Sequence, residues 1–126
     1  MTQFLLDTNV LLWYFEGSKR ILPLKNLLTS VNSDVYVSVI SFWEIIIKIR
    51  KGRLKIDFDD FSNFIKENAF FELPITSAYN KAYMELPKHH NDPFDHMLLA
   101  QAIACPMRFI TGDKLLAEYS SLVMVV

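Results

Sequence analysis

Short apolar runs alternate along the chain with segments whose hydrophobic residues recur at helical spacing. The first run, residues 4–6, is followed by Asp7-Thr8-Asn9 and then by the apolar segment 10–15. Because Asp, Thr and Asn favour the position that caps a helix, this order predicts a strand, a turn and a helix. Similar apolar or β-branched runs at 35–39, 70–75, 108–111 and 122–126 predict four more strands.

Helices are predicted between these strands. Hydrophobic spacing places them at about 20–31, 41–51, 58–68, 76–86, 93–104 and 113–119. The helix at 93–104 has the clearest start, because Asp92 suits its cap and Pro93 its first turn, and a polar loop at 87–91 precedes it. Strands that alternate with helices predict an α/β fold, with a mostly parallel sheet of about five strands covered by helices on both faces.

The length and composition fit one domain spanning residues 1–126. Hydrophobic residues make up 52% of the chain, slightly above the roughly 45–50% of an average soluble protein, so we expect part of the surplus to face another chain. Cys105 is the only cysteine, which excludes an intrachain disulfide and a cysteine-rich metal site. Because no apolar run reaches the roughly 18 residues of a membrane span and the first residues lack a basic signal-peptide start, we expect a cytoplasmic protein.

The charge is nearly balanced overall but uneven along the chain. A net charge of −1 argues against a protein that coats nucleic acid by bulk attraction. Five of the thirteen basic residues nevertheless fall within eight positions: Lys48, Arg50, Lys51, Arg53 and Lys55. This cluster fits either the solvated end of a helix or a patch that faces phosphate groups.

Four acidic residues fall where predicted strands end or the following helices begin: Asp7, Glu44, Asp95 and Asp113. The carboxyl ends of parallel strands meet at one edge of a sheet, so these side chains could come together there. Clustered carboxylates repel one another strongly unless a cation lies among them. Oxygen ligands without cysteine select hard ions, so the pattern predicts a Mg²⁺ or Mn²⁺ site.

Each acid also has a purely structural interpretation. Asp7, Asp95 and Asp113 suit the first turns of helices, where carboxylates accept hydrogen bonds from free backbone N–H groups. Ser41 and Glu44 match a capping box, and Lys48 at i+4 could pair with Glu44. Ser41, Glu44, Lys48 and Lys51 also form a polar stripe on an otherwise apolar helix, as expected for a helix that lines a cleft.

Four motifs together resemble those of the PIN-domain nucleases. They are Leu5-Leu6-Asp7-Thr8-Asn9-Val10, Ser41-Phe42-Trp43-Glu44-Ile45, Asp92-Pro93-Phe94-Asp95 and Ile110-Thr111-Gly112-Asp113. The likeness extends over nearly the whole chain. It is greatest to the VapC-like toxins of bacterial toxin–antitoxin pairs, which share the small size and the Asp-Pro-Phe-Asp element. One departure is visible, because His96 stands where these toxins often carry Arg. It could contact phosphate when protonated, act as a titratable group near the site, or simply be packed or solvated.

The resemblance implies a three-layer α/β/α fold and a toxin that cleaves RNA with Mg²⁺ or Mn²⁺. It also implies a homodimer that is inhibited by a cognate antitoxin. Matched by position, Asp7, Glu44, Asp95 and Asp113 would be the metal-binding and catalytic acids, and Thr8, Asn9, Ser41 and Thr111 would support them. We further expect phosphate contacts from five basic residues: Lys48, Arg50, Lys51, Arg53 and Lys114.

Two other functions compete with a nuclease. An aspartyl-phosphate phosphatase would use Asp7 after the first strand, but it needs a second Asp two residues later, where Asn9 stands. A non-catalytic partner-binding module would use the acids as helix caps and the apolar surplus as an interface. A nuclease is expected to be stabilised by Mn²⁺, whereas such a binding module is not.

Overall fold

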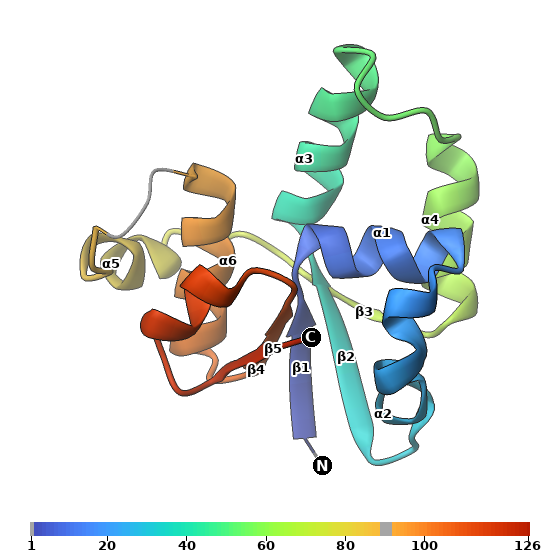
Figure 1. Ribbon diagram of the computed structural model, residues 1–126. Helices are drawn as coiled ribbons and strands as arrows, with labels where there is room; N and C mark the ends of the chain where they lie inside the picture. The colour runs from blue at the N-terminus through green and yellow to red at the C-terminus, as the bar shows by residue number, and fades with distance from the viewer. Residues whose placement is uncertain (1, 89–91) are drawn as a thin grey trace.

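The computed structural model describes residues 2–88 and 92–126 and has a five-stranded sheet at its centre (Figure 1). The strand order is β3 (Phe71–Leu73), β2 (Ser33–Ser38), β1 (Thr2–Leu6), β4 (Arg108–Thr111) and β5 (Val123–Val125). Every neighbouring pair is parallel. The sequence-based prediction of a parallel five-stranded sheet is therefore confirmed.

Helices cover both faces of this sheet, as Figure 1 shows. Near β1 and β2 lie α1 (Thr8–Glu16), the 3₁₀ helix η1 (Lys19–Leu24), α2 (Lys25–Thr29) and α4 (Phe58–Glu67). On the other side lie α5 (Tyr79–Met84), α6 (Pro93–Ala104) and the 3₁₀ helix η2 (Lys114–Glu118). The helix α3 (Val39–Arg50) begins where β2 ends and points away from the sheet. Across the described residues, no helix combines the length and apolar character needed to cross a bilayer.

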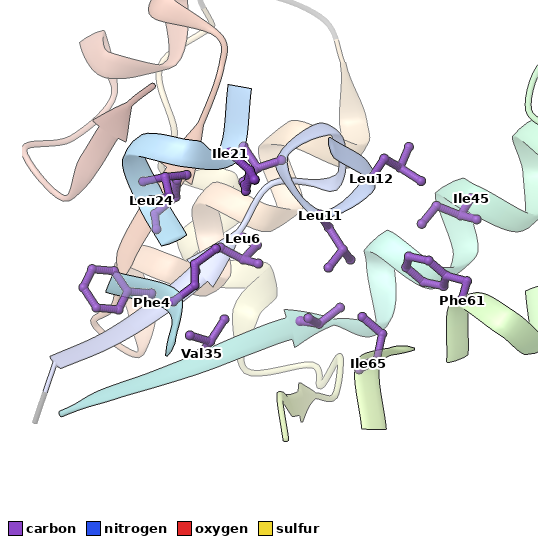
Figure 2. Packing of buried hydrophobic residues seen from close by; sticks show 14 residues of the cluster. Phe4, Leu6, Leu11, Leu12, Ile21, Leu24, Val35, Ile45, Phe61 and Ile65 are labelled. Atoms are coloured by element: carbon purple, nitrogen blue, oxygen red, sulfur yellow. The ribbon is translucent and has the colours of Figure 1, made fainter. Parts of the chain in front are cut away.

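Alternating side chains of β1 serve two hydrophobic cores. Phe4 and Leu6 belong to the first core, and Leu5 between them belongs to the second, because successive side chains of a strand point to opposite faces. Figure 2 shows the first core, in which side chains of β1 and β2 meet those of α1, η1, α3 and α4. The second core joins Leu5 and Phe109 of the sheet to α6 and η2. Burial of apolar surface on both faces thus fixes the three layers.

The predicted helix at about 20–31 forms as two shorter helices, η1 and α2. Ser18 caps η1 by accepting a hydrogen bond from the Arg20 N–H, so Pro23 lies beyond the first turn. Proline has no N–H for the α-helical hydrogen bond, and a short 3₁₀ segment accommodates it. The helix predicted at 113–119 is likewise a 3₁₀ helix, and the predicted elements 70–75 and 76–86 are shorter in the structure. Residues 89–91 of the predicted polar loop lie outside the described part.

The predicted start of α3 is wrong. Ser38, not Ser41, is the N-cap: its hydroxyl accepts a hydrogen bond from the Ile40 N–H and donates one to the buried Gln101 Oε1. Val39, predicted to end the strand, is the first helical residue. Glu44 therefore lies in the second turn of α3, so it cannot form the capping box that the sequence allowed.

Replacing Ser38 with Ala is expected to lower the free energy of unfolding by about 1–3 kcal/mol, because the helix loses its cap and Gln101 loses a buried donor. Urea denaturation measures the loss. Ser18→Ala removes an exposed cap of the same chemistry at η1 and is expected to cost less. Equal losses in the two variants would contradict the role assigned to Ser38.

Candidate metal centre

The centre of the candidate site is Asp7, at the carboxyl end of β1. Its backbone N–H donates to the Ile110 carbonyl on β4 at 2.9 Å, which extends the sheet by one step. The buried carboxylate accepts two hydrogen bonds, to Oδ1 from the Thr8 N–H (2.7 Å) and to Oδ2 from the Thr111 hydroxyl (2.6 Å). Asp7 also caps α1. Both oxygens are thus oriented from two neighbouring strand ends.

Thr8 and Ser41 connect α1 to α3 and so place Glu44. Their buried hydroxyl oxygens lie 2.9 Å apart, and Glu44 follows Ser41 by about one turn of α3. Glu44 is 9% exposed. Its Oε2 lies 3.1 Å from the Lys48 Nζ, as the i+4 spacing predicted. Its Oε1 is buried and, within the described part of the chain, has no hydrogen-bond partner. A buried carboxylate oxygen of this kind needs a cation or a donor, which the described residues do not supply.

Asp95 and Asp113 come to the same edge from the other side of the sheet. Asp95 lies in the first turn of α6, where the Asp92 carboxylate caps the helix by accepting from the Phe94 N–H (2.9 Å) and the Asp95 N–H (3.3 Å). Asp113 follows β4 and accepts from the Leu115 N–H (3.0 Å) to cap η2. The Asp113 N–H donates to the Thr111 hydroxyl, which itself donates to Asp7. A chain of hydrogen bonds therefore joins Asp113 to Asp7.

The pKa values indicate that these acids lie in one electrostatic field. Burial, and after it the negative charges of Asp7, Asp92, Glu44 and Asp113, together raise the pKa of Asp95 to about 8. Burial also raises the pKa of Asp7 to about 6, although its bonds from Thr111 and Thr8 oppose this rise and the charges of Glu44 and Asp113 add to it. The structure thus brings all four predicted acids within electrostatic reach of one another.

The residues present fit a hard divalent cation. All four acids offer oxygen, the ligand atom that Mg²⁺ and Mn²⁺ prefer, and the buried Oε1 of Glu44 lacks a partner. Within residues 2–88 and 92–126, however, no three Asp, Glu, His or Cys side chains are near enough to hold one ion together. Binding would therefore require the carboxylates to move toward one another, as side chains that repel each other do when a cation is added.

The predicted supporting residues have different surroundings. Thr8, Ser41 and Thr111 are buried and hydrogen-bonded beside the acids, as described above. Asn9 is exposed on the first turn of α1. A polar residue that the sequence analysis missed is Gln101, which is fully buried and also donates to the Pro74 carbonyl at 3.2 Å. A lone glutamine among the apolar residues 97–104 was the available signal.

Gly112 lies between Thr111, the last residue of β4, and Asp113. A Cβ atom at this position would overlap the ring of Trp13 on α1. The Arg20 guanidinium covers that ring, 3.6 Å from its centroid. The absence of a side chain at Gly112 therefore lets α1 approach the segment that carries Asp113.

The predicted basic residues follow α3 away from the acids. Lys48 is held by Glu44, whereas Arg50, Lys51 and Arg53 are exposed at the far end of α3 and just beyond it. Lys114 is exposed beside Asp113. These exposed positions fit both a solvated helix end and a phosphate-facing patch.

His96 packs within an aromatic cluster. Its Nε2 lies 3.2 Å from the Tyr119 hydroxyl, and its ring centroid is 5.8 Å from those of both Tyr83 and Tyr119. These contacts join α6 to α5 and to the end of η2. The packing role that the sequence allowed for His96 therefore matches the structure.

A family model supplies the decisive comparison: the model of the PIN domain matches residues 4–122. The chain belongs to the PIN domain family. Members of this family are nucleases, which generally use divalent metal ions. The resemblance noted from the four sequence motifs is therefore confirmed, and the PIN fold accounts for the parallel sheet with helices on both faces.

Three solved structures share the fold of this PIN domain. VapBC2 from Rickettsia felis, bound to a promoter DNA fragment, matches with a TM-score of 0.80 at 16% identity over 99% of each chain. A toxin–antitoxin complex from Klebsiella pneumoniae matches at 0.69 and 20% identity, covering 96% of this chain and 95% of that one. FitAB bound to a DNA fragment matches at 0.70 and 20% identity, over 97% and 94%. No curated protein matches significantly by sequence.

The raised pKa values predict how pH affects stability. Both folded values lie above the ordinary 3.8, so the folded PIN domain binds more protons than the unfolded chain between about pH 4 and pH 8. Its free energy of unfolding is therefore expected to fall as pH rises through this range when no metal is added. Asp95→Asn is expected to flatten the fall between pH 6 and 8, measured as melting temperature in EDTA.

The matched control is Asp34→Asn, at the opposite, amino end of the sheet. It is expected to leave the pH dependence unchanged. A wild-type slope that persists in Asp95→Asn would show that this carboxyl is not the group that titrates.

Proposed function

We propose that residues 1–126 form a single Mg²⁺- or Mn²⁺-dependent endoribonuclease domain, the toxin of a toxin–antitoxin pair. The observation that carries the proposal is the group of acids at the carboxyl edge of the sheet, in which the pKa values of Asp7 and Asp95 are raised and the buried Oε1 of Glu44 has no hydrogen-bond partner among the described residues. A partner-binding module gains nothing from such a group, which lowers stability at neutral pH. A nuclease that binds a cation there does gain from it.

The four acids would hold the metal. Asp7 and Asp95, the two with raised pKa values, are the best candidates for direct ligands, and Glu44 and Asp113 would ligate it or orient a water molecule. A divalent cation held by these acids would supply Lewis-acid chemistry, polarising the scissile phosphate, activating water and offsetting charge on the leaving oxygen.

The rest of the site would position these acids and the substrate. Thr111 and the Thr8 N–H fix both oxygens of Asp7, and Lys48 restrains one oxygen of Glu44. The burial of Asp7 and Glu44 keeps water from competing for their oxygens. Five basic residues would contact the phosphates of the RNA backbone: Lys48, Arg50, Lys51, Arg53 and Lys114.

A toxin of this kind would act in the cytoplasm, as a homodimer that its cognate antitoxin inhibits. The structural neighbours support an antitoxin partner, because VapBC2 and the Klebsiella pneumoniae protein are toxin–antitoxin complexes. Support also comes from large apolar side chains at the surface, which favour contact with another protein. Leu115 is 58% exposed and Met84 is 84% exposed.

The phosphatase alternative remains weaker. Its second aspartate would have to stand at position 9, and Asn9 is an exposed residue on α1 that cannot act as a carboxylic acid. The other three acids would also have no part in that reaction.

Asp7→Asn is expected to abolish RNA cleavage, at least a hundred-fold in rate, because the central ligand loses its charge while keeping its shape. Mn²⁺ is expected to raise the melting temperature of the wild-type protein, because the ion binds the folded state in preference to the unfolded one. Asp7→Asn should remove this rise. Cleavage of labelled RNA and thermal melts with and without Mn²⁺ measure the two effects.

Asp34→Asn serves as the control, because it removes an equal charge far from the site. Expression of the wild-type chain should arrest growth, co-expression of the adjacent reading frame should relieve the arrest, and Asp7→Asn should cause none. Undiminished cleavage by Asp7→Asn would reject the site, and cleavage without any growth arrest would reject the toxin role.

A further inference from the structure

Trp43 is a large aromatic side chain that stays at the surface beside the acids. Trp43 is 55% exposed, although it directly precedes the buried Glu44 on α3. Its ring meets that of Phe94 in an edge-to-face contact, with centroids 5.4 Å apart and planes at 70°. Phe94 in turn directly precedes Asp95 on α6. Each of the two helices thus carries an acid and, next to it, one ring of this pair.

The contact with Phe94 orients the indole without enclosing it. In an edge-to-face pair at most one face of a ring is covered by its partner, so the exposure of Trp43 leaves aromatic surface open to solvent. The pair also joins α3 to α6, whose first turns lie at the same edge of the sheet (Figure 1). The free surface therefore has a defined place next to the candidate metal centre.

We propose that Trp43, held in place by Phe94, is a stacking site for an unpaired nucleobase of single-stranded RNA. This inference rests on the function proposed above and adds a residue that would bind a base of the substrate. Aromatic rings recognise single strands because every base has a face to stack, whereas the bases of a duplex are already stacked on one another. Trp43 directly precedes Glu44 on α3 and its ring contacts Phe94, which directly precedes Asp95, so a base stacked on Trp43 would lie on the two helices that carry these acids.

The charge along the same face of α3 complements RNA. Ile46, Ile47 and Arg50 follow Trp43 at i+3, i+4 and i+7 and therefore lie on one side of the helix. Ile47, Arg50 and Lys51 line a shallow groove of about 320 Å³. An aromatic platform followed by exposed cations is the combination that binds bases and phosphates of a single strand. A cation-rich end would be of no use to a purely apolar protein contact.

The test compares variants in the Asp7→Asn background, so that the RNA stays intact. Binding of a labelled single-stranded oligonucleotide of about ten nucleotides is measured by fluorescence anisotropy in Mg²⁺ at fixed salt. Trp43→Ala is expected to weaken binding about 5- to 100-fold, the usual effect of losing one stacked base, whereas Trp43→Phe keeps most of the affinity. A duplex of the same sequence should bind no better to the parent than to Trp43→Ala.

A set of oligonucleotides with one abasic position each makes the test specific. The nucleotide whose base stacks on Trp43 should show a loss of affinity when that base is removed, and this loss should vanish in Trp43→Ala. Phe71→Ala is the matched control, because it removes a ring that is 50% exposed on the edge strand β3, where it contacts Tyr36. It should leave binding unchanged.

Three results would overturn the inference. The first is equal RNA affinity of the parent and Trp43→Ala, and the second is an abasic penalty that persists in Trp43→Ala. The third is a change of oligomeric state in Trp43→Ala with unchanged affinity per protomer, which would assign the ring to a protein interface. If the wild-type chain, which retains Asp7, still cuts RNA in Mn²⁺, these results do not contradict the proposed nuclease function. If the wild-type chain neither binds nor cuts RNA, both the nuclease function and the stacking role of Trp43 are overturned.

Discussion

Repulsion among the carboxylates at one edge of the sheet is the physical constraint on which the properties of the site depend. Two unit charges of like sign about 4 Å apart repel by roughly 4 kcal/mol at an effective dielectric near 20, and burial adds the cost of desolvation. In this PIN domain burial, and after it the repulsion, raise the pKa of Asp95 to about 8, which favours a proton on that carboxyl at neutral pH when no metal is bound. A cation bound among the acids would replace the proton and remove the repulsion.

A few buried polar contacts hold this unfavourable arrangement together. Thr111 fixes Asp7 across the β1–β4 pair, and the Thr8–Ser41 contact joins α1 to α3. Ser38 and Gln101 join the start of α3 to α6. These hydrogen bonds satisfy groups that would otherwise be buried without partners, so each stabilises the fold, and those of Thr111, Thr8 and Ser41 also lie beside the acids. The candidate site is thus built from the same contacts that connect the two layers of helices through the sheet.

The sequence could predict the elements and the edge at which the acids meet. Alternating apolar runs and helical spacing are local signals, and Asp7, Asp92 and Asp113 cap helices as their residue type favours. The start of α3 could not be predicted in this way. Both Ser38 and Ser41 suit an N-cap, and the choice between them depends on Gln101, which lies 63 residues from Ser38 along the chain.

The surroundings of His96 and the spacing of the acids depend on tertiary structure in the same way. Residue type alone allows His96 to face phosphate or to pack, and the positions of Tyr83 and Tyr119 decide for packing. Motif order likewise places four acids at one edge but says nothing of how close their oxygens are. That spacing follows from side-chain rotamers and from whether a cation is present.

The account is tested most directly by anomalous diffraction from crystals of the protein grown with Mn²⁺. The expected result is manganese at the carboxyl edge of the sheet, with carboxylate oxygens of Asp7 and Asp95 at ligand distance and Oε1 of Glu44 turned toward the ion or its water. Crystals with saturating Mn²⁺ that show no anomalous peak among these acids would contradict the central claim, because the carboxylates would then share their edge without a metal.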